Sequence, residues 1–270
     1  MIISVINLTA GAIKDAELLG VIRAINRQIA EDFEPYWGFG ARLRLEGNST
    51  TRAVKQSFVD MRGDAVLYLR NKANVKDALG YHDRNNKGIP YGFVFTELAA
   101  ELGESWTVTL SHEALELLAD SQANLLVMGP RPDGKPGQVF HWFEMCDAVQ
   151  DDTYKVDGIE VANFVLPLYF TPDGGAGGRN DFLGVEHDGK KLTPFGVNPG
   201  GYIGFYDPKT GKHRTFSRTS DKVAAKRLKL KTAAGSGRGN LRKGRADGGD
   251  GDESPAGASV ERAEKISAKK

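Results

Sequence analysis

Large apolar side chains become rare after residue 217, and this limits where a folded domain can lie. From Arg218 to Lys270 the chain is rich in Gly, Ala, Arg, Asp and Ser and has few large apolar residues. A segment of that composition cannot bury enough apolar surface to offset the entropy lost on ordering. We therefore predict one domain over residues 1–217 and a flexible, low-complexity tail over residues 218–270.

The two parts also differ in charge. The tail carries 14 Lys and Arg against 7 Asp and Glu, which leaves 22 basic and 28 acidic residues before it. A basic tail on an acidic body is either a solvated linker or a weak contact for nucleic acid. The tail has no aromatic residues that could stack on bases. Its candidate phosphate contacts are Arg238, Arg242, Lys243 and Arg245.

Three features favour a cytoplasmic protein without membrane contact. No apolar run reaches the roughly 18 residues that a membrane span needs. The apolar segment 1–8 lacks a basic n-region and an A-x-A-like cleavage site, so it is typical of a buried first strand rather than a signal peptide. Cys146 is the one cysteine, so no internal disulfide can form.

Residues 15–32 show the spacing of an amphipathic helix. Asp15 is the expected N-cap, and the helix is expected to end before Pro35 because a residue that precedes proline avoids the α region. The expected buried face comprises Leu18, Leu19, Ile22, Ile25 and Ile29.

The following segments mix strands with one further helix. Residues 41–45 and 65–69 have the composition of strands, and residues 80–83 and 91–95 are separated by a turn at 85–88. Residues 106–120 form the second expected helix. Strands and helices mixed in this way predict an α+β layer fold.

The second helix contains the motif that carries chemistry, Ser111-His112-Glu113-Ala114-Leu115-Glu116. His112 and Glu116 are four residues apart, which places both side chains on one helix face. One imidazole nitrogen and one carboxylate oxygen can then bind a single Zn²⁺ ion. Glu113 projects near the same ion, where a general base would take a proton from an activated water molecule.

This motif resembles the H-E-x-x-H helix of the zincin metallopeptidases, with Glu116 in place of the second histidine. Gln122 occupies the position of the third metzincin ligand, so that ligand set is absent. The gluzincin branch is more similar, because its third ligand is a glutamate on a later element. The resemblance implies Glu144 as third ligand and Asp147 as the carboxylate that supports His112. Asp120 competes for that supporting role.

The resemblance also implies a zincin-like mixed sheet with an active-site helix, and a zinc-dependent hydrolase that acts on a peptide or protein. An edge strand before the active helix would pair with the extended substrate, and the hairpin over residues 80–95 lies at the right place. Tyr202, in the turn that begins Gly200-Gly201, would donate a hydrogen bond to the oxyanion.

Other interpretations remain open. H-E-x-x-E can also occur on a solvated acidic helix face. His82, His141 and His187 are alternative ligands, and each also fits a turn or the surface. Cys146 is either a small buried residue or a soft ligand. The two rival functions are a binding or structural protein with the same fold but without catalysis, and a nucleic-acid-associated protein that acts through its tail.

Overall fold

The computed structural model describes residues 1–46, 63–72, 79–84, 88–172 and 178–218. Helices combine there with a mixed sheet and two antiparallel sheets, which confirms the α+β class. No helix among these residues is both long and apolar enough to cross a membrane. Almost all of the predicted tail, from residue 219 onward, and most of the predicted turn at 85–88 lie outside the described residues.

The strands in the first part of the chain form one five-stranded sheet. Its order is β2 (Arg42–Leu45), β1 (Ile2–Leu8), β3 (Ala65–Arg70), β5 (Pro90–Phe95) and β4 (Gly80–Arg84). Neighbouring strands are parallel, except that β4 runs antiparallel to β5 at the edge. The predicted first strand and the predicted hairpin are therefore both present, and the early strands at 41–45 and 65–69 correspond to β2 and β3.

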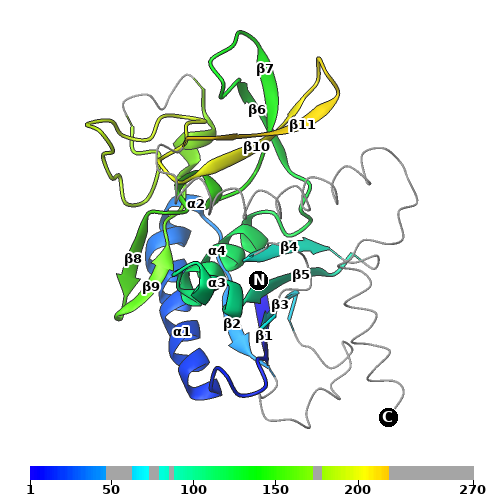
Figure 1. Cartoon of the computed structure of the whole chain (residues 1–270), viewed down its shortest axis with the longest axis vertical. Helices are drawn as coiled ribbons and strands as arrows, with labels where there is room; N and C mark the ends of the chain where they lie inside the picture. Colours follow the sequence, from blue (N-terminus) through cyan, green and yellow to red (C-terminus); the bar gives the residue numbers. More distant parts are fainter. Residues whose placement is uncertain (47–62, 73–78, 85–87, 173–177, 219–270) are drawn as a thin grey trace.

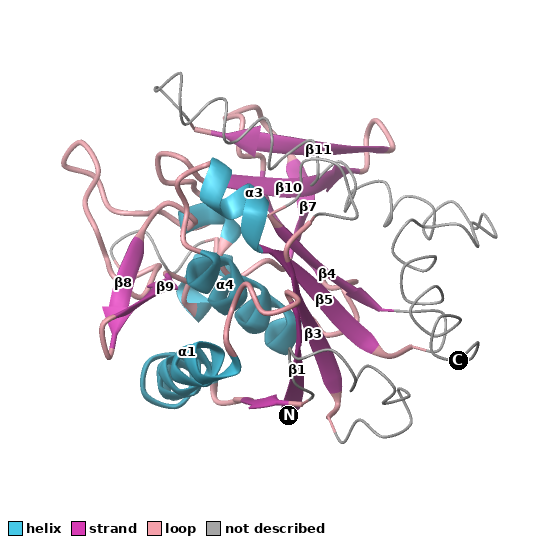
Figure 2. Ribbon diagram, turned by 60° about the horizontal axis from the view of Figure 1, so that its bottom comes forward, coloured by secondary structure: helices cyan, strands magenta, loops and turns pink. Residues whose placement is uncertain are grey.

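Side chains alternate between the two faces of this sheet. On one face, Leu67, Leu69 and Val94 join a core built with α1 (Asp15–Arg27) and α4 (Trp106–Ala119). On the other face, Tyr68 and Phe93 belong to a separate aromatic cluster. Figure 2 shows α1 and α4 together on one side of the strands. Strand alternation therefore decides which side chains of the sheet can meet α4.

The first helix differs from its prediction at its start. Asp15 is its first helical residue, and Lys14 occupies the N-cap position. Asp15 accepts a hydrogen bond from the Asn7 side chain at 2.8 Å instead. Of the expected apolar face, Leu19 is exposed. The remaining members are buried as predicted: Leu18, Ile22, Ile25 and Ile29.

The prediction that the helical path ends before Pro35 is wrong. A π-helical turn, Gln28–Phe33, and α2, Glu34–Trp37, continue the path. Pro35 lies in the first turn of α2, where its missing N–H costs no intrahelical hydrogen bond. The path ends at Gly38, whose φ of 72° is left-handed and whose N–H donates to the Glu34 carbonyl at 2.8 Å.

The second part of the chain follows α3 (Thr96–Glu101) and α4. An antiparallel sheet has the order β11 (Lys212–Ser217), β10 (Tyr202–Asp207), β7 (Gln138–Trp142) and β6 (Leu126–Pro130). A hairpin of β8 (Thr153–Val156) and β9 (Ile159–Ala162) lies beside α1 and α4 (Figure 1). Two 3₁₀ turns, η3 (Asp147–Val149) and η4 (Pro167–Phe170), lie between these strands in the sequence.

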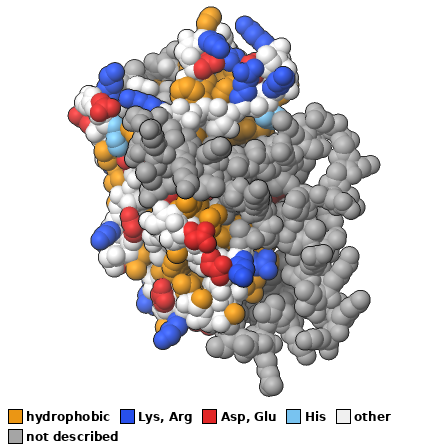
Figure 3. All heavy atoms as spheres, in the orientation of Figure 1, with side chains coloured by type: hydrophobic (Ala, Val, Ile, Leu, Met, Phe, Trp, Pro, Cys, Tyr) orange, Lys and Arg blue, Asp and Glu red, His pale blue; other side chains and the backbone are white. Residues whose placement is uncertain are grey.

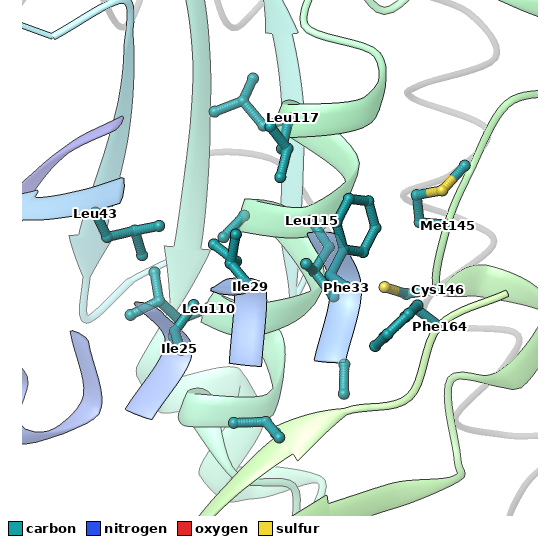
Figure 4. Packing of buried hydrophobic residues seen from close by; sticks show 14 of the residues in the cluster. Ile25, Ile29, Phe33, Leu43, Leu110, Leu115, Leu117, Met145, Cys146 and Phe164 are labelled. Atoms are coloured by element: carbon teal, nitrogen blue, oxygen red, sulfur yellow. The ribbon is translucent and has the colours of Figure 1, made fainter. Parts of the chain in front are cut away.

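Apolar side chains pack around α1 and α4, whereas charged side chains gather over the four-stranded sheet. Figure 4 shows α1 and α4 side chains packed together, with Met145 and Cys146 at the same end of the cluster as Phe33 and Phe164. On the face in Figure 3, Lys and Arg side chains gather over the four-stranded sheet, with acidic side chains among them. Arg131 in that region is held by Asp133 and Asp207, at 2.9 and 2.8 Å. Met145 and Cys146 belong to this core and lie between β7 and η3 in the sequence. The chain from β7 to η3 therefore connects the four-stranded sheet to the core that contains α4.

Candidate metal centre

The helix α4 carries His112 and Glu116, two of the candidate ligands, together with Glu113. Ser105 caps its N-terminus by accepting a hydrogen bond from the Thr107 backbone N–H at 3.3 Å. Asp120 lies at its C-terminal end and accepts backbone N–H groups of Asn124 and Leu125 at 3.1 and 2.9 Å. The predicted range of 106–120 agrees with this helix.

His112 and Glu116 meet as their spacing predicts. The Nε2 atom of His112 lies 3.0 Å from Oε1 of Glu116. The same nitrogen lies 3.2 Å from Oδ1 of Asp147, on η3. Both carboxylates thus face one ring nitrogen, whereas a supporting carboxylate would accept from the nitrogen opposite the metal. This geometry suits Asp147 as a direct ligand better than as the expected supporting partner of His112.

His82 is the residue that sequence reasoning placed only among the alternatives. It lies on β4 and is buried. Its Nδ1 atom is 3.4 Å from Oε2 of Glu113 and 3.6 Å from Oε2 of Glu116, and its Nε2 atom is 3.9 Å from Oε2 of Glu144. Strand alternation explains the position, because Tyr81 joins the aromatic cluster on the far face and His82 must face α4.

Glycines fill two closely packed positions of this hairpin. Gly92 pairs with His82, and a Cβ atom built on it would lie 2.7 Å from a Leu67 methyl carbon. Gly80 makes room for Glu113, since a Cβ at Gly80 would lie 2.7 Å from the Glu113 Oε1 atom. The absence of a side chain at Gly80 thus allows α4 to approach β4 closely.

Glu144 lies near His82, whereas Asp147 lies near His112. One group of potential ligands consists of His82, Glu116 and Glu144, whose donor atoms all lie within 4.8 Å of one another. A second group consists of His112, Glu116 and Cys146. The predicted set of His112, Glu116 and Glu144 is therefore divided between two groups that share Glu116.

Cys146 is buried next to this shared residue. Its backbone N–H donates to Oε1 of Glu116 at 3.3 Å, and its thiol donates to the His112 carbonyl at 3.9 Å. Burial raises the pKa of the Cys146 thiol well above its usual range, and the carboxylate of Glu116 adds to the effect. Without a metal the thiol is therefore protonated at neutral pH, and a bound cation would be needed to stabilise the thiolate.

The carboxylates also control the charge of His112. Burial alone would lower its pKa, but the charge of Glu116 and the hydrogen bond with Asp147 outweigh burial and raise the pKa to about 10. Burial, followed by the charge of Glu144, raises the pKa of Asp120. Neighbouring carboxylates thus favour the protonated form of both His112 and Asp120, and burial adds to this effect at Asp120.

The other candidates belong to different parts of the molecule. His141 packs on the ring of Phe195 with a centroid distance of 4.6 Å, and burial lowers its pKa to about 4. His187 lies 2.9 Å from Asp152. Tyr202 is the first residue of β10 rather than part of the turn, and it is buried. Its oxyanion role stays a prediction.

The spacing of the donor atoms suits zinc. Two ligands of a tetrahedral zinc ion, each about 2.1 Å from the metal, lie about 3.4 Å apart. The corresponding separations are 3.0 Å and 3.2 Å around His112 Nε2, 3.6 Å between His82 Nδ1 and Glu116, and 3.9 Å between His82 Nε2 and Glu144. Imidazole nitrogen, carboxylate oxygen and thiolate sulfur are all donors that zinc accepts. The residues therefore fit a divalent cation of this kind.

No protein-family model, curated protein or solved structure matches this chain. Function is therefore inferred from the geometry of the centre.

Proposed function

We propose that this protein is a zinc-dependent hydrolase, with peptide bonds as its substrate class. The observation that carries the proposal is the pair formed by His112 Nε2 and Glu116 Oε1 at 3.0 Å, with Glu113 on the same helix. These residues supply two ligands and a general base from one rigid element. Asp147, Cys146 and Glu144 are the further ligand candidates around them.

Each residue has a defined part in the reaction. Bound zinc would activate water and polarise the scissile carbonyl. Glu113 takes a proton from the attacking water and later gives it to the leaving amine. His82, 3.4 Å from the Glu113 carboxylate, orients that base. The edge of β4 lies beside α4, where an extended peptide can add as a further strand.

Replacement of the base tests this mechanism. In Glu113→Gln, size and hydrogen bonding are retained but the base is lost. We expect peptide hydrolysis to fall by about 10²- to 10⁴-fold, while zinc content and the circular dichroism spectrum stay unchanged. Glu97→Gln, at an exposed position on α3, is the matched control and should keep full activity. If Glu113→Gln hydrolyses peptides at the wild-type rate, the mechanism is wrong.

A second candidate function is a metal centre that stabilises the fold without catalysis. The observation in its favour is burial, because Glu116 is fully buried and Glu113 is only 3% exposed. Wild-type protein that binds zinc and melts at a higher temperature with it, yet hydrolyses no peptide, would support this alternative.

Contact of the tail with nucleic acid is a separate proposal, and salt-dependent binding to DNA or RNA would test it.

A further inference from the structure

The two carboxylate oxygens of Glu116 face different histidines. Oε1 lies 3.0 Å from Nε2 of His112, and Oε2 lies 3.6 Å from Nδ1 of His82. Each histidine belongs to a separate group of potential ligands, and Glu116 is the member common to both groups. A carboxylate in this position is arranged as a bridge between two cations.

Each group has donors of its own besides the shared carboxylate. On the side of α4 and η3 these are His112, Cys146 and Asp147. On the side of β4 they are His82 and Glu144, each of which offers one ligand atom within 4.8 Å of the others and of Glu116. The side chains of His82 and Glu116 are fully buried, so neither is part of a solvated acidic surface.

The balance of charge also favours a pair of cations. Glu113, Glu116, Glu144 and Asp147 all lie within 4.0 Å of an imidazole nitrogen of His82 or His112. Two imidazolium ions would neutralise half of the charge of these four carboxylates. One divalent cation would also neutralise half of this charge, whereas two divalent cations would neutralise all four carboxylates, with a Cys146 thiolate adding one further negative charge. Uncompensated charge is costly at this degree of burial.

We propose that the centre binds two divalent cations bridged by Glu116, with one cation on the His112 side and the other on the His82 side. The inference rests on the metal site of the proposed function but not on its peptidase activity. Paired cations about 3.5–4 Å apart can stabilise both the attacking and the leaving groups of a hydrolysis. His82 then binds the second cation through Nδ1, the nitrogen that otherwise faces the Glu113 carboxylate.

Metal stoichiometry tests this proposal on the full-length chain. The protein is stripped with a chelator, dialysed against Zn²⁺ and subjected to elemental analysis. We expect two zinc ions per wild-type chain and one in either His82→Ala or His112→Ala. His187→Ala, which alters a histidine outside the centre, should keep two. If an alanine variant is not folded by circular dichroism, the corresponding glutamine variant replaces it.

Electron paramagnetic resonance of the Mn²⁺-loaded protein provides a second readout. Two bridged ions should give an exchange-coupled spectrum in wild type and an isolated-ion spectrum in the His82 variant. One bound ion per wild-type chain, with an isolated-ion spectrum, would overturn the pair and leave the single-zinc function intact. Two coupled ions without peptide hydrolysis would instead contradict the proposed function and support the pair.

Discussion

At the scale of single residues, the protonation of His112 depends on the two carboxylates that face its ring. His112 faces both Glu116 and Asp147, and its pKa is raised to about 10. In the metal-free protein this pairing stabilises the fold fully below the unfolded pKa near 6.5 and is lost as the pH rises through 10. A metal ion competes with the same proton, because only neutral imidazole is a ligand.

Metal binding should therefore release a proton from His112 at neutral pH. We expect zinc affinity to increase as the pH rises from 7 towards 10 and the proton is lost. Isothermal titration calorimetry in two buffers of different ionisation enthalpy measures the number of protons released. Zinc binding at pH 7 with the same apparent enthalpy in both buffers would show that neither His112 nor Cys146 gives up a proton to a bound ion.

At the scale of elements, two hydrogen-bonded contacts position α4. Ser111 donates to Gln28 Oε1 at 2.8 Å and accepts from the Ala162 N–H at 3.0 Å. Gln28 in turn donates to the Ala162 carbonyl at 2.8 Å. This buried triangle joins the π-helical turn, α4 and β9. On the other side of α4, Gly80 lets β4 approach Glu113.

Ser111→Ala should lower the free energy of unfolding by about 1–3 kcal/mol, because it leaves buried groups of Gln28 and Ala162 without their partner. Urea denaturation followed by circular dichroism measures the change. Ser217→Ala, at an exposed strand position, is the control and should change stability little. Equal stabilities of the two variants would show that the triangle contributes nothing.

Gly80→Ala should reduce hydrolysis more than zinc binding. The added methyl group would lie 2.7 Å from the Glu113 carboxylate and 2.9 Å from the Phe93 carbonyl oxygen, so the base and the adjoining part of the hairpin must shift. Gly20→Ala on α1, with only an arginine tip 3.9 Å away, should keep activity and stabilise the helix slightly. Activity and metal content of both variants decide the question, and full activity of Gly80→Ala would place the base elsewhere.

At the scale of the whole molecule, the sequence predicts local features better than the centre that they form. The spacing of His112 and Glu116 lies within one helix, so periodicity alone predicts their contact. His82 could not be paired with them in this way, because its contact depends on how β4 crosses α4. The pairing of Phe205 with His141 likewise joins strands far apart in sequence, and the four-stranded sheet was not predicted.

The tail belongs to this scale as well. Residues 219–270 have a composition that does not build a core, so removal of this segment should leave the melting temperature of the domain unchanged within about a degree. Thermal denaturation of the full chain and of a version ending at Arg218 makes the comparison. A large drop on truncation would mean that the tail docks on the domain.

The most direct test of the account is the zinc content of the purified chain after loading and exhaustive dialysis. The centre described here predicts at least one tightly held zinc ion per wild-type chain, and a loss of zinc in Glu116→Ala because that residue serves both ligand groups. Wild-type protein that retains no zinc or other transition metal after loading would contradict the claim that this buried cluster is a metal site.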